Sequence, residues 1–444
     1  IRVLICLILS IITATTSSYS QEITYGTGDW DHETLGNHRA VIYVEEPSDV
    51  VKAYVLWRRL DNVDDKGLIL IDALTGQRVK NIYCVQKNKD SGTILFDPVS
   101  GQGRYYLYYM PGKNAGSSWF PEVKYENPME DYDPEWKKNA VNKSIVREAK
   151  TISIESQNSF HSFYPMETPV TKPELAEFLQ RNSDKDFLLF PEDRSFPIRM
   201  TETIPYRWYK KGVNTNFSGS AYRDECYAWQ IGVFSPFREL DNVKLIFSDL
   251  KNETGSSIPS GALKCINAGG NDYLGRKFYK NVIVPKGEVR AMWILTNIDK
   301  NQPAGIYKGR VNVLADGTNT YTVNVSIQIK EHRIEDKGYD TPANMSRLNW
   351  LDATRGIDDE VVAPYTPVTV EGKSFTILGR KVSIDKFGFP SKITSSFTGS
   401  NHQVDGPDKD ILSGSIQLRL LKDGKEIKLK TKTLVITSQS SGAV

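Results

Sequence analysis

The sequence is poor in cysteine, and beyond its first 20 residues it has no apolar run long enough to cross a membrane. Four of its 444 residues are cysteines. Cys6 lies in the N-terminal leader, which leaves Cys84, Cys226 and Cys265, and an odd number cannot pair completely within one chain. A disulfide between Cys226 and Cys265 is one arrangement, and buried free thiols are the alternative that we expect.

The sequence also lacks an excess of charge of one sign and the common catalytic motifs. Its 56 basic and 54 acidic residues are interspersed and give a formal net charge of +2, so we expect no nucleic-acid partner. There is no Gly-x-Ser-x-Gly elbow, and the five histidines show no zinc-binding spacing. Gly26-Thr-Gly28 and Gly101-Gln-Gly103 lack the third glycine of a dinucleotide-binding loop and indicate turns. We therefore predict no cofactor and no metal site.

The first 20 residues have the features of a secretory signal peptide. Arg2 is a short basic head, residues 3–12 form an apolar run, and Ser18 and Ser20 are small residues before a cut at Gln21. The run is shorter than the ~20 residues that span a bilayer. We expect a secreted protein, extracellular or periplasmic and without a membrane partner; a signal anchor is the alternative.

Five Asn-x-Ser/Thr sequons follow in the mature chain. In a eukaryotic secretory pathway they would be surface glycosylation sites, whereas in a bacterium they would carry no such meaning. The sequons begin at Asn142, Asn216, Asn252, Asn324 and Asn344.

Period-2 alternation of apolar and polar residues dominates the sequence and predicts strands. Residues 321–329 alternate over their whole length, and Asp316-Gly317 joins them to an earlier strand at residues 307–314 as a hairpin. A second hairpin is predicted around Asp423-Gly424, with Ile416, Leu418 and Leu420 before the turn and Ile427 and Leu429 after it.

One helix and one recurring sequence motif depart from this alternating pattern. Thr171 and Glu174 form a capping box ahead of a short apolar stripe, and Asn182 can end the helix. A glycine-rich turn followed by a tyrosine-bearing strand occurs twice, at Tyr105 and at Tyr307. Tyrosines near strand starts are common in stacked sandwich domains.

Linker composition divides the sequence into a leader and three β-rich domains. After the signal peptide at residues 1–20, residues 21–125 form a first β-sandwich. Residues 126–150, where acidic and then basic side chains gather, look like an exposed connector. Residues 151–335 form a second sandwich, and residues 340–444 form a third domain that we expect to be incomplete at its C-terminus.

Adjacent acids are the candidates for chemistry or ligand binding. Glu192, Asp193 and Arg194 lie between apolar segments, so we expect them to be paired internally, with Arg194 or Arg199 on one of the two carboxylates. A ligand-facing role is the alternative.

A second segment places an aromatic side chain among acids and an arginine. Its members are Trp350, Asp352, Arg355, Asp358 and Asp359. Aromatic faces stack on sugars while acids and arginine bind sugar hydroxyls, so this segment is our first candidate for glycan contact. A buried tryptophan in a domain-entry loop, and a calcium site formed by the three aspartates, are the alternatives.

The order of motifs in the chain resembles the N-terminal β-sandwich region of glycosidases akin to family 123. The likeness covers most of residues 25–400. Its motifs are Phe187-Leu-Leu-Phe-Pro-Glu-Asp-Arg194, Pro197-Ile-Arg-Met200, Pro205-Tyr-Arg-Trp208, Phe217-Ser-Gly219, Glu225-x-Tyr-x-x-Gln230-x-Gly-Val-Phe234, Phe247-Ser-Asp-Leu250, Pro303-Ala-Gly-Ile-Tyr-Lys-Gly309, Leu348-Asn-Trp-Leu-Asp352, Asp358-Asp-Glu-Val361 and Ala363-Pro-Tyr365.

The resemblance implies an activity that resides outside these sandwiches. In such proteins the sandwiches precede a (β/α) barrel, and the family's activity type is retaining β-N-acetylgalactosaminidase. The substrate's acetamido group attacks, an Asp orients it and a neighbouring Glu protonates the leaving oxygen. Asp224-Glu225 and Asp359-Glu360 match that dipeptide without its strand–helix setting, so we transfer no catalytic residue. A barrel takes about 250 residues with eight helices, so we expect a fragment or a gene model truncated at both ends.

We therefore expect an all-β chain of tandem sandwiches, immunoglobulin-like or jelly-roll-like, with one short helix and no complete catalytic barrel. It would be the non-catalytic N-terminal portion of a secreted glycoside hydrolase, inactive alone. Its partners would be the C-terminal barrel and a carbohydrate, such as a glycan that contains N-acetylhexosamine. A free-standing secreted carbohydrate-binding or adhesion protein is the rival hypothesis.

Overall fold

The computed structural model of the chain describes residues 23–128, 132–354, 357, 359–431 and 433–444. The predicted signal peptide lies outside these residues. The chain divides into two compact units, of which one combines the residues up to Cys265 with Asn281–Ser346 and the other combines Ile266–Lys280 with Arg347–Val444. Strands predominate, and the fold is all-β with sandwich-like architecture, as expected.

The first sandwich is built around β10 (Arg147–Ser156), which pairs with β2 in one sheet and with β3 in the other. The sheet order is β4-β7-β2-β10-β3-β6-β5, and β1 joins β10 in parallel. Alternate residues of these strands form a core with Trp57, Phe96 and Tyr105. The other elements are β1 Thr24–Thr27, α1 His32–Leu35, β2 His38–Val44, β3 Val51–Val55, β4 Ile69–Asp72, β5 Ile82–Lys87, β6 Gly92–Phe96, β7 Gly103–Tyr108, β8 Gly112–Asn114, β9 Val123–Tyr125 and α2 Pro134–Asn142.

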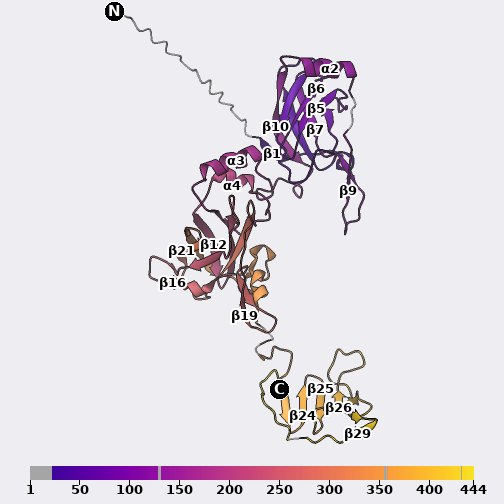
Figure 1. Cartoon of the computed structure of the whole chain (residues 1–444), viewed down its shortest axis with the longest axis vertical. Helices are drawn as coiled ribbons and strands as arrows, with labels where there is room; N and C mark the ends of the chain where they lie inside the picture. The colour runs from indigo at the N-terminus through magenta and orange to yellow at the C-terminus, as the bar shows by residue number, and fades with distance from the viewer. Residues whose placement is uncertain (1–22, 129–131, 355–356, 358, 432) are drawn as a thin grey trace, which may run out of the picture. The chain divides into compact units, whose positions relative to one another are not determined.

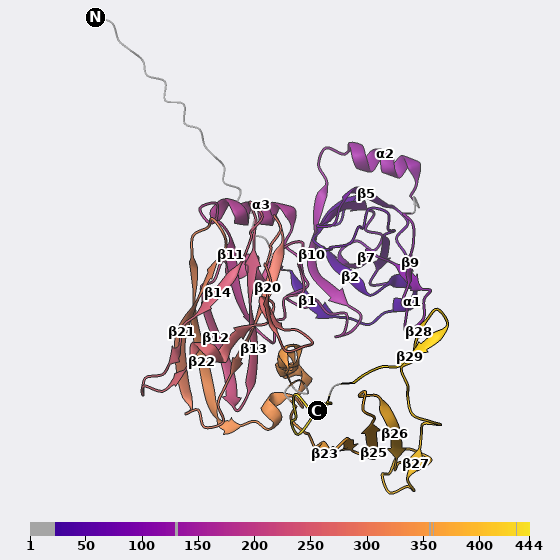
Figure 2. The same cartoon turned by 60° about the horizontal axis from the view of Figure 1, so that its bottom comes forward.

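The structure differs from the expected connector at residues 126–150, most of which belongs to the first sandwich. Helix α2 packs Ala140 against Val50 and Leu95, and β10 begins at Arg147. Glu135 and Lys138 of α2 are exposed, so the composition resembles a linker although Ala140 and Trp136 anchor the helix. Figures 1 and 2 show α2 at one end of this sandwich.

The second sandwich packs two antiparallel-rich sheets face to face. One has the order β11-β13-β20-β17, and the other has the order β12-β22-β21-β15-β16 with β14 beside β21. The elements are α3 Lys172–Arg181, β11 Leu188–Asp193, α4 Tyr206–Lys211, β12 Asn216–Arg223, β13 Cys226–Phe234, β14 Lys244–Phe247, β15 Leu250–Lys251, β16 Ser257–Ile258, η1 Ser260–Ala262, β17 Leu263–Cys265, β20 Val289–Asn297, β21 Gly305–Leu314, β22 Tyr321–Arg333, η2 Asp336–Gly338 and η3 Pro342–Asn344.

Several sequence patterns are confirmed in this sandwich. β22 buries Val323, Val325, Ile327 and Ile329 and turns the residues between them outward. The capping box is formed as predicted at the start of α3, which ends at Asn182. Figures 1 and 2 show α3 across one end of the sandwich. The remaining short helices were not predicted.

The second unit is a five-stranded antiparallel sheet with two small hairpins. The predicted hairpin at residues 416–429 forms only in part, because its strands begin at Leu420 and end at Ile427. The elements are β18 Gly269–Asn271, β19 Lys277–Tyr279, η4 Ser346–Asp352, β23 Thr369–Glu371, β24 Ser374–Ile377, β25 Arg380–Ile384, β26 Pro390–Ser395, β27 Lys409–Asp410, β28 Leu420–Lys422 and β29 Lys425–Ile427.

Within the described residues, Cys84, Cys226 and Cys265 form no disulfide. Burial raises the pKa of Cys226 to about 11, so this thiol stays protonated at neutral pH. Within the described part of the chain, no helix is long and apolar enough to span a membrane.

Candidate functional site

The charged triplet Glu192-Asp193-Arg194 lies at the end of β11. Its first residue, Glu192, has a structural role. β11 pairs antiparallel with β13, which places Glu192 opposite Gln230. Glu192 is 6% exposed, and its Oε1 accepts hydrogen bonds from Trp208 Nε1 at 3.0 Å and from Arg207 Nε at 3.1 Å. These charge-assisted bonds satisfy a carboxylate that would otherwise be costly to bury.

Asp193 is held as a carboxylate beside a buried tyrosine. Its oxygens accept hydrogen bonds from the Tyr227 hydroxyl, from Ser195 N at 3.0 Å and from Ser195 Oγ at 2.8 Å. Burial alone would raise the pKa of Asp193, but these hydrogen bonds outweigh it and hold the pKa below its usual range. Burial, and then the Asp193 charge, raise the pKa of Tyr227. The pair therefore stays carboxylate and phenol at neutral pH.

Arg194 pairs with a different carboxylate from the one we expected. Its Nη1 donates to Glu225 and, at 3.0 Å, to the Asn344 carbonyl. Glu225 has a fully buried side chain that also accepts from Tyr222 N at 2.7 Å. The expected pairing of Arg194 or Arg199 with Glu192 or Asp193 is wrong, because β13 brings Glu225 within reach of Arg194. Arg199 instead forms an exposed pair with Glu167.

A cavity of about 370 Å³ lies where Asp193 and Arg194 meet β12, and we call it the Asp193 pocket. Ser195, Ser218 and Ser220 complete its walls with Gly219. A side chain at position 219 would collide with the Tyr227 hydroxyl, so glycine is required there. The buried Ser220 hydroxyl has no hydrogen-bond partner among the described residues. The pocket thus offers an acceptor carboxylate, a guanidinium and three hydroxyls.

The neighbouring dipeptide Asp224-Glu225 is fully engaged in ion pairs. Asp224 accepts from Arg333 Nε at 2.9 Å and lies 3.3 Å from Lys337 Nζ, while Glu225 pairs with Arg194. Both carboxylates of this dipeptide are therefore engaged in ion pairs within the sandwich.

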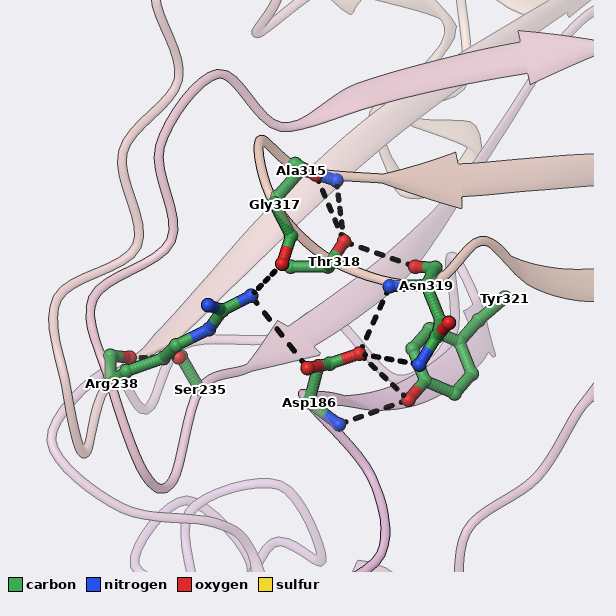
Figure 3. Close-up of polar contacts among 8 residues, drawn as sticks. All are labelled: Asp186, Ser235, Arg238, Ala315, Gly317, Thr318, Asn319 and Tyr321. Atoms are coloured by element: carbon green, nitrogen blue, oxygen red, sulfur yellow. Dashed lines mark hydrogen bonds and ion pairs between the residues drawn. The ribbon is translucent and has the colours of Figure 1, made fainter.

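A network at the start of β11 fixes the segment that carries the pocket (Figure 3). Asp186 accepts hydrogen bonds from Asn319 N at 3.0 Å and Asn319 Nδ2 at 3.1 Å, and its N–H donates to the Tyr321 hydroxyl at 2.9 Å. Arg238 lies 3.6 Å from its other oxygen. The hydrogen bond from Asn319 N is the main reason why the pKa of Asp186 is lowered. The network ties β11 to the turn between β21 and β22.

The first candidate segment for glycan contact is only partly described. Trp350 is 55% exposed, with the Arg347 guanidinium 5.3 Å from its ring centre. Asp352 accepts from Asn271 Nδ2 at 2.7 Å, and Asp359 accepts from Ser440 Oγ at 2.8 Å. Arg355 and Asp358 lie outside the described residues. Asp352 and Asp359 are thus hydrogen-bonded to different residues. The side chain of Trp350, by contrast, is more than half exposed to solvent.

The described residues contain no group of three or more His, Cys, Asp or Glu side chains that could hold a metal ion. The sequons stay predictions, and the structure places their asparagines differently. Asn142 ends α2 and is exposed, while Asn216 and Asn324 lie opposite each other on β12 and β22. Asn252 and Asn344 are partly exposed, in a turn and in η3.

The sequence did not point to Ser218 and Ser220, which line the pocket, or to Tyr227, whose hydroxyl donates to Asp193. The signal that could have found two of them is the period-2 spacing of Ser218 and Ser220, which places both side chains on one face of β12. Tyr227 and Glu225 could not be found in this way, because their partners lie more than 30 residues away and come together only by pairing of β11 with β13.

Two family models match the chain. The glycoside hydrolase 123, N-terminal domain matches residues 28–157, which is the first sandwich, and the glycoside hydrolase 123, third domain matches residues 368–444. These two stretches of the chain are thus similar to domains of glycoside hydrolase family 123. A comparison with curated proteins found no match.

The solved structures that match parts of the chain include an enzyme and a fimbrial subunit. A family 123 glycoside hydrolase from Clostridium perfringens, described in terms of glycolipid glycan hydrolysis, is 20% identical over 32% of this chain, with a TM-score of 0.26. The match covers 27% of that enzyme's chain. MyfA, the major subunit of Myf fimbriae from Yersinia enterocolitica, is 16% identical over 24% of this chain and 87% of its own, with a TM-score of 0.17.

Proposed function

We propose that this chain is the non-catalytic β-sandwich portion of a secreted glycoside hydrolase and that it contacts glycan through the Asp193 pocket. The family domains give the glycoside hydrolase context. The all-β fold favours a role in glycan binding and in bracing a catalytic domain. The barrel to which the family resemblance assigns catalysis is not found among the described residues. A C-terminal barrel would be the partner of these sandwiches, and residues 1–20 would direct export.

The protonation states around the pocket favour binding over hydrolysis. Glycoside hydrolysis requires one carboxyl group that is protonated and able to donate to the leaving oxygen. Asp193 has a lowered pKa, so it is ionised at neutral pH and does not supply that proton. An ionised carboxylate instead serves as a strong acceptor for sugar hydroxyls.

The observation that carries the proposal is the convergence of the Asp193 carboxylate, the Arg194 guanidinium and the exposed Ser218 side chain on one pocket. Sugar hydroxyls would donate to Asp193 and would exchange hydrogen bonds with Ser218 and Arg194. Glycans that contain N-acetylhexosamine are the expected class, since the family resemblance implies this substrate.

A glycan array tests the proposal with the full chain. We expect wild-type protein to bind N-acetylhexosamine glycans and Ser218→Ala to bind several-fold less, with unchanged stability because the Ser218 side chain is exposed. Ser257→Ala is the matched control, since Ser257 is exposed on β16 and does not line the pocket. Absence of glycan binding, or equal binding by Ser218→Ala, would contradict the proposal.

A further inference from the structure

A second cavity, of about 220 Å³, lies where residues 160–168 pack against the first sandwich. His38 of β2 and Arg59, in the loop after β3, form one wall. His161, Ser162 and Phe163 form the opposite wall, and Phe163 also packs on the core of the sandwich. We call this cavity the Arg59 pocket. It has room for roughly seven water molecules at about 30 Å³ each.

Arg59 brings hydrogen-bond donors into this pocket that the protein leaves unused. Its side chain is 25% exposed, and Nε donates to Asp61 Oδ1 at 2.9 Å. Among the described residues, Nη1 and Nη2 have no hydrogen-bond acceptor. Two guanidinium nitrogens are therefore available to a bidentate oxyanion, which is the geometry that arginine recognises best.

The charges around the pocket leave one positive charge without a counterion. Arg58 is neutralised by two hydrogen bonds to Glu174, at 2.5 and 2.8 Å, and the pocket's Glu167 is paired with Arg199. Asp61 is shared between Arg59 and Lys66, which lie 2.9 and 3.1 Å from its oxygens. One carboxylate thus faces two cations, and an anion bound in the pocket would neutralise the remaining positive charge.

The two histidines add neutral hydrogen-bonding groups. His38 Nε2 donates to the His161 carbonyl at 2.9 Å, and burial lowers the pKa of His38 to about 4. His161 Nδ1 lies 3.4 Å from Asn37 Nδ2, a donor, so Nδ1 accepts and Nε2 carries the hydrogen. Burial also lowers the pKa of His161, so at neutral pH its Nε2 is an uncharged donor.

The backbone beside Arg59 is strained. Arg58, which also lines the pocket, has a φ of 50°, in the left-handed region that favours glycine. Strain of this kind gathers at ligand sites.

We propose that the Arg59 pocket binds the carboxylate or sulfate group of an acidic sugar. The oxyanion would lie against the two free nitrogens of Arg59 and receive a hydrogen bond from His161 Nε2. The sugar ring would rest on the aromatic faces of Phe163 and Phe160, and Phe160 is 88% exposed at the rim. This site is separate from the Asp193 pocket and does not depend on the glycan binding proposed there.

Calorimetric titration of the full chain at neutral pH and low salt tests this proposal with three probes: glucuronate, inorganic sulfate and glucose. We expect saturable binding of glucuronate, weaker binding of sulfate and none of glucose. Equal affinity for sulfate and glucuronate would overturn the acidic-sugar assignment, and equal affinity for glucose would overturn the anion site.

Two variants locate the binding. Arg59→Gln should weaken glucuronate binding at least tenfold. His161→Ala keeps the backbone carbonyl that holds His38 and should weaken binding several-fold even if Arg59→Gln folds poorly. His402→Gln, in the other unit, is the control and should bind as wild type. Unchanged binding in His161→Ala together with either unchanged binding or misfolding in Arg59→Gln would refute the proposal.

Discussion

The ion pair between Arg194 and Glu225 should contribute strongly to the stability of the second sandwich. The Glu225 side chain is 0% exposed and that of Arg194 is 12% exposed. Arg194→Met would leave a buried carboxylate with Tyr222 N as its main remaining donor. Removal of one partner from such a buried pair costs about 3–5 kcal/mol. We therefore expect Arg194→Met to lower the free energy of unfolding by about 3–5 kcal/mol.

Arg199→Met provides the matched control because it removes the same side chain from an exposed pair. Arg199 and Glu167 are 63% and 46% exposed, so this variant should lose no more than about 1 kcal/mol. The double variant Arg194→Met/Glu225→Gln should recover part of the loss, because a neutral amide still accepts from Tyr222 N.

Urea unfolding followed by the fluorescence of buried Trp208 and Trp229 measures these differences. Each variant is compared with wild type through the midpoint and slope of the transition of this sandwich. A loss of less than about 1 kcal/mol in Arg194→Met, or equal losses in Arg194→Met and Arg199→Met, would refute the reasoning from burial.

Three further predictions concern acid, an aromatic surface and glycosylation. Hydrogen bonds from Arg58 outweigh burial and hold the pKa of Glu174 below that of an ordinary glutamate, so this carboxylate stabilises the fold at neutral pH and less as pH falls through its lowered pKa. Glu174→Gln should lower the urea midpoint at about pH 7 and reduce its acid dependence, and an unchanged acid dependence would count against the pair. Trp350 is a second candidate glycan contact apart from the Asp193 pocket, so Trp350→Ala should lower glycan binding on an array while thermal unfolding stays unchanged, because the ring is 55% exposed; full binding would exclude Trp350 as a glycan contact. In a eukaryotic host, Asn216 and Asn324 should not carry glycans on the same molecule, because their side chains are hydrogen-bonded at 3.1 Å on neighbouring strands; glycopeptide mass spectrometry that finds both occupied together would contradict this.

The recurring motif of a glycine-rich turn followed by a tyrosine-bearing strand shows how local sequence can predict part of a fold. Tyr105 and Tyr307 are both fully buried, and their hydroxyls donate to the carbonyls of Gly101 and Pro303, at 3.1 and 2.9 Å. Each hydroxyl thus bonds to the residue four positions earlier, as in the tyrosine corner of sandwich domains. The capping box at α3 was predicted for the same reason, since all of its members lie within one turn.

Features that depend on contacts distant in sequence could not be predicted in this way. Residues 126–150 have the composition of a linker, and only the pairing of β10 with β2 and β3 makes them part of the first sandwich. The partner of Arg194 depends on which strand lies beside β11, so sequence proximity favoured the wrong carboxylates. Asp193 and Arg194 were predicted as a ligand-facing alternative, but the serines that complete their pocket come from β12.

The central claim is that this chain binds glycan without cleaving it. The most direct measurement is a mass-spectrometric time course of an N-acetylhexosamine glycan that the full chain retains, incubated with the purified protein. The account predicts that the glycan is recovered intact from the complex at every time point. Cleavage products that increase in proportion to protein concentration would contradict it.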